Sequence, residues 1–68
     1  MLINTYYRMG NEIIVLDDAN VRWPVSNMID RFGEETDDAR EAVCVVIKLS
    51  ENMWLPVHLS NLEHRTIN

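Results

Sequence analysis

Two histidines and one cysteine are the side chains best suited to proton transfer, nucleophilic attack or metal binding in this chain of 68 residues. His58 and His64 have an ordinary pKa near neutrality, and Cys44 is the sole thiol. A nucleophilic cysteine needs an exposed, electropositive setting, whereas Cys44 stands between Val43 and Val45. The spacing of these side chains also matches no strong metal-ligand pattern. We therefore predict no catalytic residue, no metal site and no cofactor.

Paired carboxylates are a second possible source of chemistry, and they occur at Asp17-Asp18, Glu34-Glu35 and Asp37-Asp38. Acid catalysis by such a pair requires one carboxyl group to stay protonated in a dry pocket, and a chain this short has little room to build one. A glycine-rich phosphate loop is also lacking, because Gly10 and Gly33 stand alone. The sequence favours a protein that is not an enzyme.

The acidic side chains are concentrated in one part of the chain. Eleven Asp and Glu residues against six Lys and Arg give a formal charge of −5, and the segment from Asp30 to Glu41 holds six of these acids with two of the bases. A surface of this sign repels phosphate groups, so we expect no direct binding of nucleic acid and expect a protein partner with a basic surface. A simple solvated connection is the alternative interpretation of this charge run.

The candidate contacts with a basic partner are six carboxylates: Asp17, Asp18, Glu34, Glu35, Asp37 and Asp38. Arrayed on a surface, they would imitate the phosphates of DNA and face Arg and Lys side chains of a nucleic-acid enzyme. Small inhibitors made by bacteriophages are similar to this chain in size and acidity, a similarity of composition that carries over no residue. The resulting hypothesis is a small acidic protein-binding module of the phage-inhibitor type, which blocks a basic surface of a host enzyme by charge mimicry.

The run from Ala42 to Leu49 is the longest stretch of apolar and β-branched residues, and it predicts the central strand of a sheet. At the two-residue period of a strand, Val45 and Ile47 share one face and Cys44 and Val46 share the other. A chain this short rarely covers both faces, so the second face suggests a partner or a second copy of the chain. The candidate residues of this apolar contact are Cys44, Val46, Trp54 and His58. We expect a homodimer, and a homodimeric structural or assembly protein without an inhibitory role is the alternative function.

Four apolar residues predict a short helix in the middle of the chain. They recur at i, i+3, i+4 and i+7, which places them on one helical face: Val25, Met28, Ile29 and Phe32. Pro24 suits the first turn of this helix, and Gly33 suits its end.

Strands are expected on both sides of the helix, two before it and two after it. They cover residues 2–7, 12–17, 42–49 and 53–59. Gly10-Asn11 favours a tight hairpin turn in the first pair, and Pro56 places the last strand at a sheet edge because proline cannot donate to a ladder. The predicted fold is α+β with the order ββαββ: two hairpins form a four-stranded, mainly antiparallel sheet with one short helix on one face.

Length and composition indicate a single domain over residues 1–68, with a tail at 60–68 that is expected to fray. A folded chain of this size buries only about 60% of the surface of its unfolded form. Cys44 is the one cysteine, so no internal disulfide can supplement the core. Residues 1–7 show no signal-peptide pattern, and no apolar run approaches the roughly 18 residues of a membrane span. We expect a cytoplasmic protein that binds no membrane.

Overall fold

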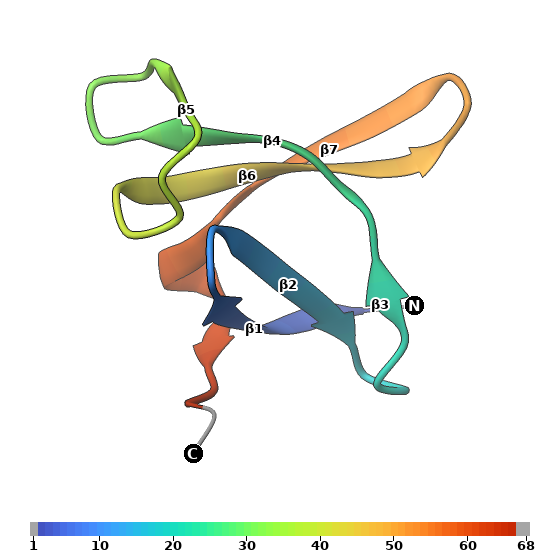
Figure 1. Cartoon of the computed structure of the whole chain (residues 1–68). Coiled ribbons are helices and arrows are strands. Elements are labelled where there is room, and N and C mark those ends of the chain that lie inside the picture. Colours follow the sequence, from blue (N-terminus) through green and yellow to red (C-terminus); the bar gives the residue numbers. More distant parts are fainter. Residues whose placement is uncertain (1, 67–68) are drawn as a thin grey trace.

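The computed structural model describes residues 2–66, which form two four-stranded sheets (Figure 1). The strands are β1 (Ile3–Met9), β2 (Glu12–Asp17), β3 (Arg22–Trp23), β4 (Val25–Asp30), β5 (Glu35–Thr36), β6 (Ala42–Ser50), β7 (Met53–His58) and β8 (Glu63–His64). The first sheet has the order β3-β2-β1-β8, and the second has the order β5-β4-β6-β7. The one helical element of these residues is a 3₁₀ turn, η1 (Leu59–Asn61), and they contain no helix long and apolar enough to cross a membrane. The α+β prediction is therefore wrong, because the chain is almost entirely sheet.

The segment predicted as a helix is strand β4 and the turn that follows it. β4 pairs with β6, and the register shifts by one residue at Ser26, which forms a β-bulge. Val25 and Met28 thereby lie opposite alternate residues of β6 and both pack against the core, although they are three positions apart in the chain. Ile29 lies opposite Cys44 of β6, on the other face of the sheet. Phe32 lies in the turn after β4 with 74% of its surface exposed. The bulge thus lets two residues at helical spacing, Val25 and Met28, share one face of a strand.

The chain passes between the two sheets twice, first through an extended stretch at Pro24 and later through η1. β3, at the edge of the first sheet, leads through Pro24 directly into β4 of the second, and Figure 1 shows this stretch passing from one sheet to the other. Pro24 is not in a first helical turn as predicted but at this junction, where its carbonyl accepts a hydrogen bond of 3.0 Å from the N–H of Lys48. A strand that changes sheets in this way makes a corner of a small two-sheet fold.

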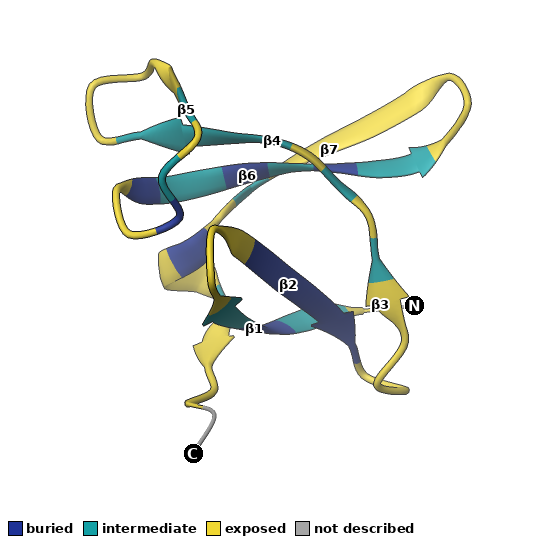
Figure 2. Ribbon diagram, in the orientation of Figure 1, coloured by how far each residue is buried: buried dark blue, intermediate teal, exposed yellow. Residues whose placement is uncertain are grey.

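The core lies between the two sheets, and Figure 2 shows the buried positions on their facing strands. Its members are Tyr6, Ile13, Val15, Ala39, Ala42, Val45, Ile47 and Leu59. β2 is buried at every position after Glu12, so a strand that is apolar on both faces is covered on both. On β6 the fully buried residues are Val45 and Ile47, whereas Cys44 and Val46 are half-buried.

The structure contains both predicted hairpins, but they belong to separate sheets, so the prediction of one four-stranded sheet is wrong. β1 and β2 pair antiparallel around Gly10-Asn11, and Gly10 has a φ of 60°, which suits glycine because a side chain would be strained there. β6 and β7 also pair antiparallel. β7 lies at the edge of the second sheet, as Pro56 predicts.

The tail predicted to fray takes part in the fold as far as residue 65. Leu59 is buried in η1, and β8 pairs in parallel with β1 at Thr5 and Tyr6. Arg65 donates its backbone N–H to the carbonyl of Tyr6 at 2.8 Å. Residues 60–65 thus make defined contacts, while residues 67–68 of the segment expected to fray lie outside the described residues.

Candidate functional site

The acidic connection, residues 30–41 between β4 and β6, has turns that are held by its own side chains. The carboxylate of Asp30 accepts hydrogen bonds from the N–H groups of Phe32 and Glu34 at 2.9 and 3.0 Å. Thr36 Oγ1 accepts a further hydrogen bond of 3.1 Å from the N–H of Asp38. The exposed carboxylates on this defined backbone are those of Glu34, Glu35, Asp37 and Glu41.

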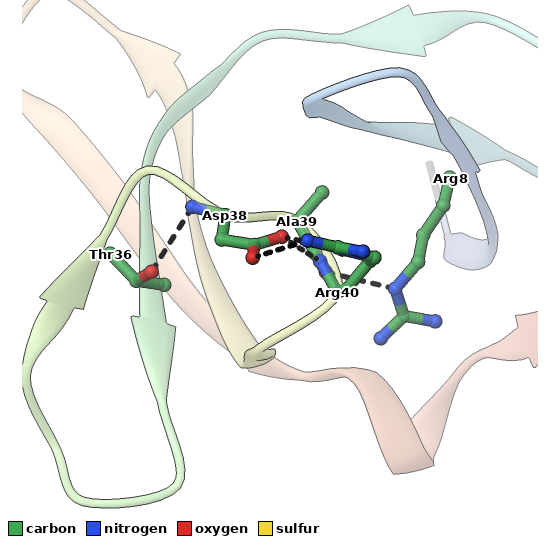
Figure 3. A network of polar contacts seen from close by, with 5 residues as sticks. All are labelled: Arg8, Thr36, Asp38, Ala39 and Arg40. Atoms are coloured by element: carbon green, nitrogen blue, oxygen red, sulfur yellow. Dashed lines mark hydrogen bonds and ion pairs between the residues drawn. The ribbon is translucent and has the colours of Figure 1, made fainter.

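Asp38 forms an ion pair within the acidic connection (Figure 3). Its carboxylate accepts hydrogen bonds from the N–H of Arg40 at 2.9 Å and from Nε and Nη2 of the same residue at 3.2 Å. The hydrogen bonds from Arg40 lower the pKa of Asp38 below its ordinary value, and the carboxylate raises the pKa of Arg40. The charge of Asp38 is therefore already compensated inside the chain.

Arg8 of β1 fastens the acidic connection to the first sheet. Its Nε donates to the carbonyl of Ala39 at 2.9 Å, and its Nη2 donates to the carbonyl of Ala42 at 3.2 Å. Figure 3 shows the Arg8 side chain pointing to this part of the connection. The same guanidinium lies 5.4 Å from the centre of the Tyr6 ring, within the range of a cation–π contact. The acidic connection is thus anchored at its end next to β6.

Asp17 is buried and organises the turn between β2 and β3. Its Oδ1 accepts from the N–H groups of Ala19 and Val21 at 2.8 and 2.9 Å, and its Oδ2 accepts from Nε1 of Trp23 at 2.8 Å. The hydrogen bond from Trp23, followed by those from the backbone, lowers the pKa of Asp17 below its ordinary value. All of these bonds are internal, so Asp17 stabilises the turn and fixes the indole of Trp23.

The six predicted acidic contacts do not form one array. Asp18 lies in the β2–β3 turn, where its Oδ1 accepts from the N–H of Leu2, and Figure 1 places this turn far from the turn between β4 and β5. Glu34, Glu35 and Asp37 remain together and exposed on the acidic connection. The structure therefore gathers three of the six, while Asp17 and Asp38 have internal roles.

A cleft of about 340 Å³ opens where the strand containing β3 and β4 leaves β2. Arg22 lines this cleft, and its guanidinium lies 3.8 Å from the carboxylate of Glu12. Other lining residues are Glu12, Ile13, Trp23, Val25, Glu35 and Asp37. Three carboxylates against one guanidinium make the lining negative. Sequence reasoning missed Glu12 and Arg22, because only the bent strand brings them near the acidic connection.

The four residues predicted for an apolar contact share the outer face of the second sheet. In the antiparallel ladder the directly opposite pairs are Cys44 with His58, Val46 with Pro56 and Lys48 with Trp54. Opposite residues project from the same face, which here is the one turned away from Val45 and Ile47. Trp54 is 52% exposed, and Cys44 and Val46 are half-buried. We call Cys44, Val46, Trp54, Pro56 and His58 the outer apolar face.

Both histidines make contacts that stabilise the fold. Nδ1 of His58 accepts from the N–H of Ser60 at 3.2 Å and lies 2.7 Å from Ser60 Oγ, so the ring caps η1. His64 stacks on Tyr6 with 4.8 Å between ring centres. Within residues 2–66 no group of three or more His, Cys, Asp or Glu residues is arranged to hold a metal ion.

The fold and these surfaces define a small two-sheet β domain with an acidic cleft at the junction of its sheets. Comparisons of this chain with protein-family models, with curated proteins and with solved structures gave no match.

Proposed function

We propose that this chain is a small acidic protein-binding module that engages a basic surface of another protein through its acidic connection. The observation that carries the proposal is the fixed backbone of that connection, held by Asp30, by Thr36 and by Arg8 from the opposite sheet. A charged surface that is already ordered loses little conformational entropy on binding. Its exposed carboxylates are thus suited to meeting Arg and Lys side chains.

The proposed contact consists of Glu34, Glu35 and Asp37, the exposed carboxylates around β5. Asp17 is left out because it is buried, and Asp38 is left out because Arg40 already compensates its charge. Asp18 lies in the β2–β3 turn, which is far from the turn between β4 and β5 (Figure 1). The contact is smaller than the array of six carboxylates inferred from sequence.

We further propose that the module acts by charge mimicry, in the manner of phage inhibitors that occupy the nucleic-acid-binding surface of a host enzyme. Complementary charge favours rapid and specific association, and a negative module of this kind would compete with phosphates for the same Arg and Lys residues. We propose a cytoplasmic setting, which the free thiol of Cys44 supports. We propose no catalytic activity, cofactor or membrane contact.

A matched pair of charge reversals tests this function. We expect the immobilised chain to retain a nucleic-acid-binding protein from a bacterial lysate, and the isolated chain to displace DNA from that protein. Glu35→Lys with Asp37→Lys should abolish the displacement, and raising the salt from 50 to 200 mM should weaken binding by roughly tenfold or more, because the Debye length shortens. The control, Glu51→Lys with Glu63→Lys, makes the same charge change at other exposed positions and should leave the displacement unchanged. Equal effects of the two double variants would contradict a local acidic contact.

A homodimer is the second candidate function, and the outer apolar face favours it. Trp54 projects from the same face as half-buried Val46 and Cys44. The open edge of β7 is a poorer contact, because Pro56 removes a backbone donor from it. Self-association would therefore join the faces of two sheets.

A further inference from the structure

The cleft between β2 and β4 contains two strand edges that have no neighbouring strand. β3 pairs with β2 only at Val15 and Leu16, and β5 pairs with β4 only at Met28 and Ile29. Within residues 2–66, the start of β2 and the start of β4 therefore have no strand beside them on the cleft side. These two uncovered edges diverge from the junction at Pro24.

The hydrogen bonds at the ends of these edges define where their main-chain groups point. The N–H of Asp17 donates to the carbonyl of Val21 at 3.0 Å, so the main-chain groups of Asp17 point to the side of β3. Because this direction alternates along a strand, the N–H and C=O of the other odd-numbered residues of β2, including Ile13, point to the same side. The carbonyl of Pro24 points to β6, where it accepts from Lys48. Because direction alternates along a strand, the next residue, Val25, points its N–H and C=O toward β2.

Ile13 and Val25 would form the next rung of the first sheet. The register that places Val15 opposite Trp23 would, if continued, place Ile13 opposite Val25. The pairing stops at Trp23, and both Ile13 and Val25 line the cleft of about 340 Å³. This volume is at the lower end of the roughly 300–1,000 Å³ that is typical of binding pockets. The cleft therefore offers main-chain donors and acceptors from the edges of both β2 and β4.

The side chains around these edges define the charge of a fitting ligand. Glu35 and Asp37 lie on the side of the acidic connection, whereas Glu12, on the β2 side, lies 3.8 Å from Arg22, which partly compensates its charge. The indole of Trp23, fixed through its Nε1 by Asp17, adds an aromatic wall. Carboxylates and an indole both attract Lys and Arg side chains.

We infer that this cleft binds an extended, basic peptide segment, which adds as a strand along the main chain of Ile13 and Val25 and directs its cationic side chains to Glu35 and Asp37. The inference rests on the proposed function and narrows the partner from any basic surface to a chain segment that can enter as a strand. Strand addition combines main-chain hydrogen bonds with contacts at alternate side chains, so a peptide that alternates Lys with Val is the matching sequence.

The test uses three synthetic peptides and the complete chain, with binding followed by amide NMR. The first peptide alternates Lys and Val, the second replaces Lys by Glu, and the third keeps Lys but is N-methylated at every second residue. We expect the first to shift the amide signals of Ile13 and Val25 and the indole signal of Trp23. The second should not bind, and N-methylation should weaken binding by about tenfold or more through the lost hydrogen bonds.

Each other outcome would overturn the inference in a distinct way. Equal binding of the N-methylated peptide would exclude strand addition but leave the charge-based function standing. Equal binding of the Glu peptide would exclude selection for a basic ligand. Binding without shifts at Ile13 and Val25, or no binding of the Lys peptide, would exclude this cleft, while displacement of DNA by the chain would still test the proposed function separately.

Discussion

The two sheets differ in how fully they are covered. In the first sheet, β2 is buried at every position from Ile13 to Asp17. In the second sheet, β6 is fully buried only on its inner face, and β7 is exposed at every position except Val57 (Figure 2). A chain of this length has too few residues to bury both sheets to the same extent. Burial is concentrated in one sheet, and the other keeps an open face.

The candidate contacts follow this difference. The acidic connection and the outer apolar face belong to the second sheet, and the cleft lies where that sheet separates from the first. The first sheet contributes support: Arg8 fastens the connection, and Asp17 fixes Trp23. The first sheet thus holds the candidate contacts in place, and the second exposes them. Three measurements test this difference between the sheets.

The largest effect is expected from two identical substitutions on neighbouring residues of β6. Val45 is fully buried and Val46 is half-buried on the outer apolar face. Val45→Ala should lower the free energy of unfolding by roughly 1.5–3 kcal/mol, through lost burial and the cavity left behind. That is a large share of the about 3–10 kcal/mol expected for a chain of this length. Urea unfolding followed by circular dichroism measures the change.

Val46→Ala is the matched control for that measurement. It removes the same atoms from a half-buried position, so we expect a loss below about 1 kcal/mol. A loss as large as that of Val45→Ala would mean that the outer apolar face is covered in solution, and the contrast between the faces would no longer hold.

The sequence could predict those parts of the fold that depend on local signals. Hairpins and the edge position of β7 follow from local signals, Gly10-Asn11 and Pro56, which act within a few residues. The helix prediction failed because Val25 and Met28 acquire a common face through a bulge, and a bulge depends on the partner strand. The division into two sheets depends on the bend at Pro24, which has no distinctive local pattern.

The candidate site was predictable to a similar extent. Alternation along each strand correctly grouped Cys44 and Val46 of β6 and grouped Trp54 and His58 of β7, because a strand has a fixed two-residue period. The four residues lie on the same face of the sheet. The acidic residues required knowledge of tertiary contacts. Nothing adjacent to Asp17 in the sequence indicated that its carboxylate would bond the indole six residues away.

A smaller effect is expected from the outer apolar face, where self-association is proposed. If two copies stack through this face, Trp54→Ala should weaken dimerisation by about tenfold, since a buried aromatic side chain often dominates an interface. Sedimentation velocity over a range of concentrations measures it. Phe32→Ala removes another exposed ring, in the turn after β4, and should leave association unchanged. A wild-type chain that stays monomeric at all concentrations would remove the dimer from consideration.

The smallest effect concerns acid, and it compares one carboxylate from each region. The pKa of Asp17 is lowered chiefly by the hydrogen bond from Trp23, and that of Asp38 chiefly by the hydrogen bonds from Arg40. A carboxyl whose folded pKa lies below the unfolded value of about 3.9 stabilises the fold above that pH. The contribution is lost as the pH falls through the folded pKa, because protonation then favours the unfolded chain.

Asp17→Asn and Asp38→Asn should therefore lower the melting temperature at pH 7 and converge with the wild type as the pH falls below about 4. The decrease should be larger for Asp17→Asn, because its carboxylate is buried and bonds an indole and two backbone groups, whereas the partner of Asp38 is an exposed arginine. Salt should reduce the effect of Asp38→Asn more strongly, since exposed ion pairs are screened. If both variants lower the melting temperature equally and with equal salt sensitivity, the hydrogen bonds of Asp17 stabilise the fold no more than the exposed ion pair of Asp38 does. Thermal melts across pH and salt measure both quantities on the same three proteins.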